Sequence, residues 1–135
     1  MGILDFWRSK DVRAVLAALD VERRAAGSLF LSLGFELASP TVMAAIRNAP
    51  GKVEAKLREE HMVPRTLVYL MLVNQCGSLI QSGVYHNAIG GGLLMQGTGL
   101  VALWQLAATE LERAGVWGAE EASEYREVFW KQRGA

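Results

Sequence analysis

A stretch without formal charge, from Thr66 to Thr109, constrains this sequence more than any other feature. Arg65 precedes it and Glu110 follows it, and no Asp, Glu, Lys or Arg lies between them. A solvated surface of that length normally carries charges. The stretch must therefore be buried in a core, buried against another chain or placed in lipid.

Two helical arms are predicted within the uncharged stretch. The first is expected over Pro64–Val84 and the second over Leu93–Leu111, where apolar residues recur at helical spacing. Between them lies Gly90–Gly92, whose residues admit backbone angles that other residues avoid. Ala114–Gly115 is typical of a helix C-cap. The pattern indicates an αα-hairpin with a glycine-rich elbow.

Further helices are predicted on both sides of the hairpin. Apolar spacing predicts a long first helix over Lys10–Leu37, in which Gly27 and Gly34 favour a kink or a close helix contact. Ser39 is expected to cap a second, short helix over Pro40–Asn48, because serine followed by proline is typical of a helix start. A surface helix is predicted over Lys52–His61, and a last helix over Ala119–Arg133 is expected to pack against the hairpin.

The predicted fold class is all-α, a single-domain helical bundle of about five or six helices around the central αα-hairpin. A chain of 135 residues is long enough for one core and too short for two ordinary domains, so residues 1–135 are expected to form one domain. Cys76 is the only cysteine, which excludes an intrachain disulfide. A reducing cytoplasmic location is the simplest expectation, and the Ala, Arg and Gly usage is compatible with a bacterial or phage protein.

One face of the first arm is polar but uncharged. Its side chains recur at steps of three and four residues, which places them on one side of a helix. Buried amides and hydroxyls need partners, so the stripe is expected to meet another helix, a second chain, water or a ligand. The candidate interface or ligand-binding residues are Asn74, Gln75, Ser78, Gln81, Ser82, Tyr85, His86, Trp104 and Gln105.

Signatures of catalysis and of cofactor binding are weak. His61 and His86 lie in different segments and lack the spacing of metal ligands, so no metal and no other cofactor is expected. The glycines from Gly92 to Gly97 have phosphate-loop spacing but lack the lysine and the preceding strand. Nothing near Cys76 in the sequence lowers its pKa for a nucleophilic pair with His86. A non-enzymatic protein is therefore favoured, with an enzyme as a third class.

The charge balance bears on the class of partner. Lys and Arg together number 14, as do Asp and Glu, so no global field favours nucleic acid. The leading prediction is a small helical interaction protein that self-associates or binds a protein partner through residues 66–109. A small-molecule-binding or sensing domain with a pocket between the arms is the first alternative. A membrane-associated hairpin is the second, because each arm approaches the length that spans a bilayer.

Overall fold

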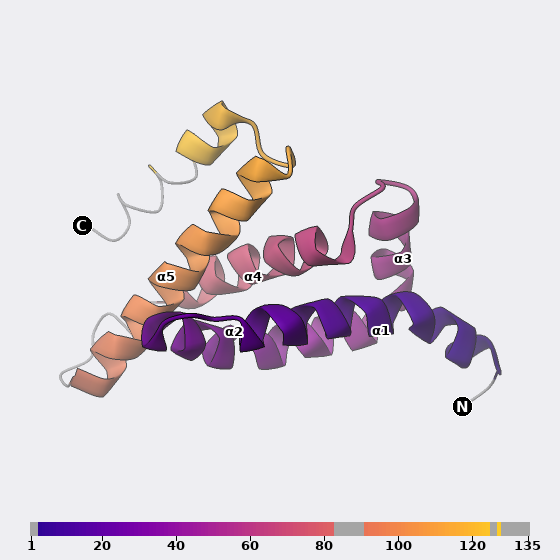
Figure 1. The fold of residues 1–135 in the computed structure, drawn as a ribbon, viewed down its shortest axis with the longest axis horizontal. Coiled ribbons are helices and arrows are strands. Elements are labelled where there is room, and N and C mark those ends of the chain that lie inside the picture. The colour runs from indigo at the N-terminus through magenta and orange to yellow at the C-terminus, as the bar shows by residue number, and fades with distance from the viewer. Residues whose placement is uncertain (1–2, 83–90, 125–126, 128–135) are drawn as a thin grey trace.

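The chain forms a bundle of helices in a computed structural model, which describes residues 3–82, 91–124 and 127 (Figure 1). Side chains are described for residues 10–82, 95–124 and 127. Every regular element in these residues is a helix, which confirms the predicted all-α class. The labelled helices are α1 (Ile3–Arg24), α2 (Leu29–Asn48), α3 (Pro50–Arg58), α4 (Pro64–Gln81) and α5 (Gly91–Arg113). A further short helix begins at residue 119.

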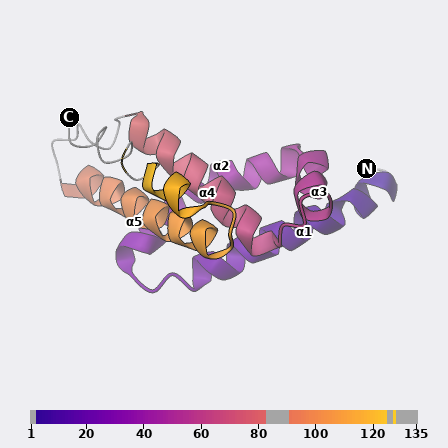
Figure 2. The ribbon, with the colours of Figure 1, turned by 90° about the horizontal axis from the view of Figure 1, so that it is seen from above.

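The predicted hairpin is present as α4 and α5, and the other helices pack around it. The most extensive helix contacts are those of α5 with α2 and with α4, while α1 contacts α2, α3 and α4. Helices α1 and α2 run in opposite directions (Figure 1 and Figure 2). In Figure 1, α5 is steeply inclined to both of them. The largest fully buried side chains come from four helices: Val15, Phe35, Ile46, Val68, Leu72, Cys76, Leu100, Leu103 and Leu111.

The first helix is shorter than predicted. The chain leaves the helix after Arg24 and restarts at Leu29, so the prediction of one helix over 10–37 was wrong. Ser28 caps the new helix, because its Oγ accepts a hydrogen bond of 3.1 Å from the Leu31 amide. Gly27 lies in the connection between α1 and α2 and not at a kink inside one helix. Periodicity missed the break because both helices turn apolar residues toward the same core.

Proline lies inside α2 rather than at a helix start, so the predicted boundary at Ser39 was also wrong. Ser39 is buried, with 4% of its surface exposed. Pro40 has no amide hydrogen, so the Glu36 carbonyl lacks its usual donor four residues later. An interior proline costs about 3 kcal/mol. Burial of Phe35 before it and Ile46 after it contributes roughly 1.5–3 kcal/mol each, which offsets that cost.

Helices α2 and α5 cross with their backbones in contact at two glycines. A Cβ on Gly34 would lie 2.4 Å from the Gly99 carbonyl oxygen and 2.8 Å from the Leu103 Cβ. A Cβ on Gly99 would lie 2.8 Å from the Phe30 carbonyl oxygen. Any larger residue at either position would separate the two helices. The close helix contact predicted at Gly34 is therefore confirmed.

The remaining helix ends differ from prediction by a few residues. Helix α3 begins at Pro50 and ends at Arg58, whereas the surface helix was predicted over 52–61. Helix α5 includes Gly91, so the predicted elbow glycines are partly helical, and residues 83–90 lie outside the described part. Gly115 has a φ of +74°, as its predicted role at a C-cap requires. Of the last predicted helix, residues 119–124 and 127 are described as helical.

Candidate functional site

Four of the predicted interface residues form one exposed face of α4. Asn74, Ser78, Gln81 and Ser82 are all exposed, and their steps of three and four residues place them on one side of the helix. Ser82 is the C-cap of α4, and its hydroxyl donates a hydrogen bond of 2.6 Å to the Leu79 carbonyl in the last turn of the helix. We call this uncharged surface, from Asn74 to Ser82, the α4 face. In the single chain it meets solvent.

The other predicted residues lie in different surroundings. Trp104 of α5 is buried, and a Cβ on Gly77 of α4 would stand 3.7 Å from its Nε1 atom. The indole therefore packs between the hairpin arms at this level. Gln75 is half-buried, and Gln105 is exposed on α5. Tyr85 and His86 lie outside the described residues.

A groove of about 400 Å³ adjoins the α4 face and runs between α2, α3 and α4. Asn74 belongs both to the face and to the groove lining, so the two surfaces are continuous. Lys56 also lines the groove, and its ammonium lies 3.0 Å from the Glu60 carboxylate, one helical turn later. The lining residues are Ala45, Asn48, Ala49, Lys52, Val53, Lys56, Leu67, Leu70, Met71 and Asn74.

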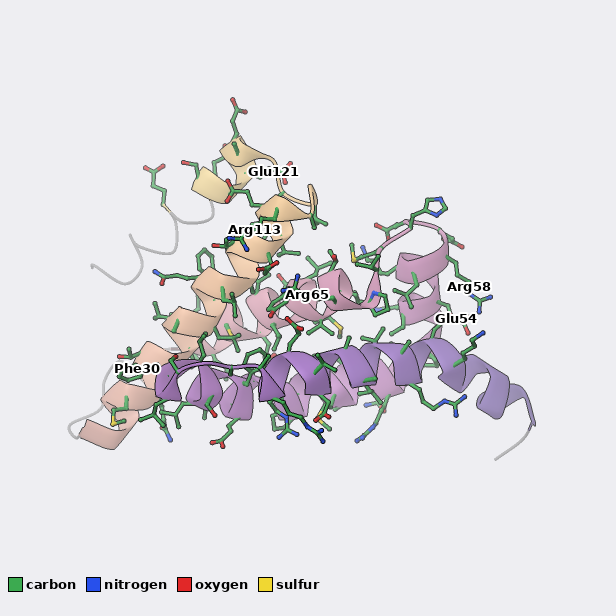
Figure 3. The ribbon with its side chains drawn as sticks, viewed as in Figure 1. Phe30, Glu54, Arg58, Arg65, Arg113 and Glu121 are labelled. Atoms are coloured by element: carbon green, nitrogen blue, oxygen red, sulfur yellow. The ribbon has the colours of Figure 1, made fainter. Side chains whose placement is uncertain are left out.

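Charged residues from three helices meet at the end of the hairpin away from its elbow. Two of them, Arg65 of α4 and Arg113 of α5, are labelled in Figure 3. Arg65 donates from Nη1 to the Glu110 carboxylate at 2.9 Å and from Nε to the Glu22 carboxylate at 3.0 Å. The Tyr69 hydroxyl donates to the same Glu22 oxygen at 2.5 Å. Arg113 donates to Glu110 at 3.1 Å. This charged cluster ties α1, α4 and α5 together.

The charged cluster borders a hollow of about 390 Å³ between the two arms. Burial, with the hydrogen bond to Glu22, raises the pKa of Tyr69, so its hydroxyl stays protonated. The bonds to Glu110 and Glu22 raise the pKa of Arg65, so its guanidinium stays charged. Each carboxylate already has a cation partner. The arrangement therefore suits structural support better than proton transfer.

Sequence reasoning missed the charged cluster, although one signal was available. Arg65 and Glu110 are the two charges that bound the uncharged stretch. Two arms of similar length that fold back on each other bring their outer ends together. The boundary charges of a predicted hairpin are thus candidates for an ion pair.

Cys76 is buried in α4, and burial raises the pKa of its thiol to about 12. The thiolate is the reactive form, so its fraction at pH 8 falls by a factor on the order of 1000 relative to a free cysteine. We expect iodoacetamide to label Cys76 slowly in the native protein and rapidly in concentrated urea, as followed by intact-mass spectrometry. Equal labelling rates in the two states would show that Cys76 is not buried.

The described residues provide little basis for metal binding. Among them, no group of three or more His, Cys, Asp or Glu residues could hold a metal ion. His61 is exposed in the connection between α3 and α4, with a φ of +54°.

Among the described helices, α2 combines the length and the apolar composition that a membrane span requires, whereas α4 and α5 are long enough but not sufficiently apolar. Length and composition are the only criteria in this comparison, and a core helix of a soluble protein meets them too. One third of the apolar window of α2 is buried inside the bundle. Leu29 and Phe30, at the start of α2, are among the exposed large hydrophobic residues.

The strongest candidate for a functional surface is therefore the α4 face with the adjoining groove. It combines several predicted residues with a cavity. No charge interrupts the α4 face along the helix, and Lys52 and Lys56 lie on the α3 side of the groove. Comparisons of the chain with models of protein families, with curated proteins and with solved structures found no match.

Proposed function

We propose that this protein is a small, non-enzymatic helical interaction protein that pairs with a second copy of itself through the α4 face. The observation that carries the proposal is an exposed face without charge on the central helix. Asn74, Ser78 and Gln81 meet solvent there, within a stretch that has no Asp, Glu, Lys or Arg. Surfaces that stay in water are normally rich in those four residue types. A second chain that covers the α4 face explains their absence.

An uncharged face is complementary to itself. In a two-fold dimer, a residue near the axis meets its own copy, so a charged residue there would meet a like charge. Amide side chains can pair with their own copies instead, because each has donors and an acceptor. Asn74 and Gln81 supply two such amides on either side of Ser78. Leu70 and Met71, half-buried at the groove, add apolar surface at one end of the face.

Substitution of Ser78 by a residue of either charge tests this proposal. Like charges about 4 Å apart repel by roughly 1–4 kcal/mol at a protein surface. We therefore expect Ser78→Glu and Ser78→Arg each to raise the Kd of the dimer about tenfold or more. The measurement is light scattering coupled to size exclusion over a concentration series. Ala17→Glu, which adds a charge at an exposed position of α1, is the control and should leave the dimer unchanged.

Two results would contradict the proposal. A wild-type monomer over the whole concentration series would exclude self-association. Dissociation by Ser78→Glu but not by Ser78→Arg would show that the face meets a negatively charged surface rather than its own copy.

A further inference from the structure

The antiparallel helices α1 and α2 enclose a cleft of about 300 Å³, separate from the α4 face. Its volume lies at the lower end of the range of small-molecule pockets. Leu16 and Leu19 of α1 and Met43 of α2 give it apolar walls. Each helix contributes residues at steps of three and four, so the cleft follows the helix axes.

An unsatisfied hydroxyl lies in this cleft. Ser39 lines it and is buried, with 4% of its surface exposed, and its Oγ has no hydrogen-bond partner among the described residues. The next residue is Pro40, which leaves the Glu36 carbonyl without its usual amide donor. A hydroxyl and a carbonyl that both lack a helix partner therefore lie on one turn of α2. A buried hydroxyl such as that of Ser39 is normally satisfied by a protein group, an ordered water or a ligand, whereas Glu36 lies on the exposed side of the turn.

The cleft also has free charges, and they lie apart along α2. Neither Glu36 nor Arg47 has a hydrogen bond or ion pair with another described residue. They are eleven residues apart, which is about 16 Å along a helix. The remaining carboxylate, Asp20, is already bonded to Arg23 at 2.8 Å and to Arg24 at 3.0 Å. An anion would therefore be attracted toward Arg47 and repelled from Glu36.

From these observations we infer that the cleft between α1 and α2 binds a small amphipathic anion. Its acidic group pairs with Arg47, its apolar body lies against Leu16, Leu19 and Met43, and a polar group satisfies the Ser39 hydroxyl. Pro40 is part of the site, because within the continuous helix α2 it leaves the Glu36 carbonyl, on the same turn as Ser39, without its usual amide donor. This inference concerns α1 and α2 and does not depend on pairing through the α4 face.

Two dyes that differ by one group test the inference on the native protein. Anilinonaphthalene sulfonate has apolar rings, an N–H group and a sulfonate, and N-phenyl-1-naphthylamine is the same molecule without the sulfonate. Both fluoresce more strongly in apolar sites. We expect saturable binding of the sulfonate dye with one site per chain. Arg47→Gln should raise the Kd of the sulfonate dye about tenfold, and it should change the Kd of the uncharged dye by less than about twofold.

Ser39→Ala separates a binding role from a structural one. Loss of one hydrogen bond should raise the Kd of the sulfonate dye about fivefold. The same change removes an unsatisfied buried hydroxyl, so the Tm of the free protein should stay the same or rise. Controls are Ser78→Ala on the α4 face and Lys52→Gln in the other groove, neither of which should alter dye binding.

Several outcomes would overturn the inference. The first is that the wild-type protein binds neither dye at millimolar concentration. The second is that Ser39→Ala and Arg47→Gln both leave binding of the sulfonate dye unchanged, which would show that a water alone satisfies Ser39. Loss of binding in Lys52→Gln would place the dye in the groove between α2, α3 and α4 instead.

Discussion

Replacement of Gly34 by alanine is expected to destabilise the protein by about 3 kcal/mol, the upper end of the cost of overpacking. The added Cβ would stand 2.4 Å from the Gly99 carbonyl oxygen and 2.8 Å from the Leu103 Cβ. Neither atom can rotate away, because one belongs to the backbone and the other is fixed to it. Helices α2 and α5 must therefore move apart. This cost exceeds the roughly 1 kcal/mol by which helix propensity favours alanine over glycine.

Gly51→Ala is the matched control. Gly51 is also helical and exposed, and no heavy atom lies within 4 Å of the position that its Cβ would take. Only the difference in helix propensity then remains, so Gly51→Ala should raise the free energy of unfolding by up to about 1 kcal/mol. Urea unfolding followed by circular dichroism measures the change in the free energy of unfolding for both variants. If Gly34→Ala is as stable as the wild type, the two helices do not cross in this geometry.

Replacement of Arg65 by methionine has the second largest expected effect, a loss of about 2 kcal/mol. Arg65 is the partner of two carboxylates, Glu22 and Glu110, whose side chains are only 13% and 11% exposed. Exposed ion pairs contribute up to about 1 kcal/mol, and removing one partner of a buried pair costs about 3–5 kcal/mol. The half-exposed guanidinium places this cluster between those limits. Methionine keeps much of the side-chain length, so the change isolates the charge.

A second ion pair provides the comparison for Arg65. Arg23→Met removes a cation whose partner, Asp20, lies on the same exposed turn of α1, so little change is expected. Adding Glu110→Gln to Arg65→Met should recover part of the lost stability, because it removes a carboxylate left with one cation fewer. Thermal unfolding of the single and double variants measures both effects. Equal losses for Arg65→Met and Arg23→Met would show that the charged cluster does not support the bundle.

The sequence was sufficient for the fold class and for the hairpin. The run between Arg65 and Glu110 has helical periodicity, a proline at one end and a cap at Gly115, and local signals of this kind do not depend on tertiary structure. The close contact at Gly34 was predictable too, because glycine destabilises a helix interior and is expected there where a neighbouring backbone leaves no room for a side chain. The ion pair between Arg65 and Glu110 required only the assumption that the two arms are of similar length.

The missed features depend on packing rather than on local preference. Ser39 and Pro40 form a strong start signal, yet burial on both sides of the proline keeps α2 continuous. The break after Arg24 leaves the apolar period intact, so periodicity could not reveal it. The exposure of Asn74 and Ser78 was not predictable either, because a polar stripe in an uncharged segment gives no indication of which face the neighbouring helices leave open.

The crossing at Gly34 and Gly99 also has a kinetic consequence. It joins segments that are separated in the sequence by all of α3 and α4, whereas α4 and α5 are consecutive. Closing a longer loop costs more chain entropy, so the hairpin should assemble before α2 docks on it. A contact that forms late affects the unfolding rate more than the refolding rate. In stopped-flow experiments Gly34→Ala should therefore mainly accelerate unfolding, which makes this glycine pair a determinant of how long the folded state persists.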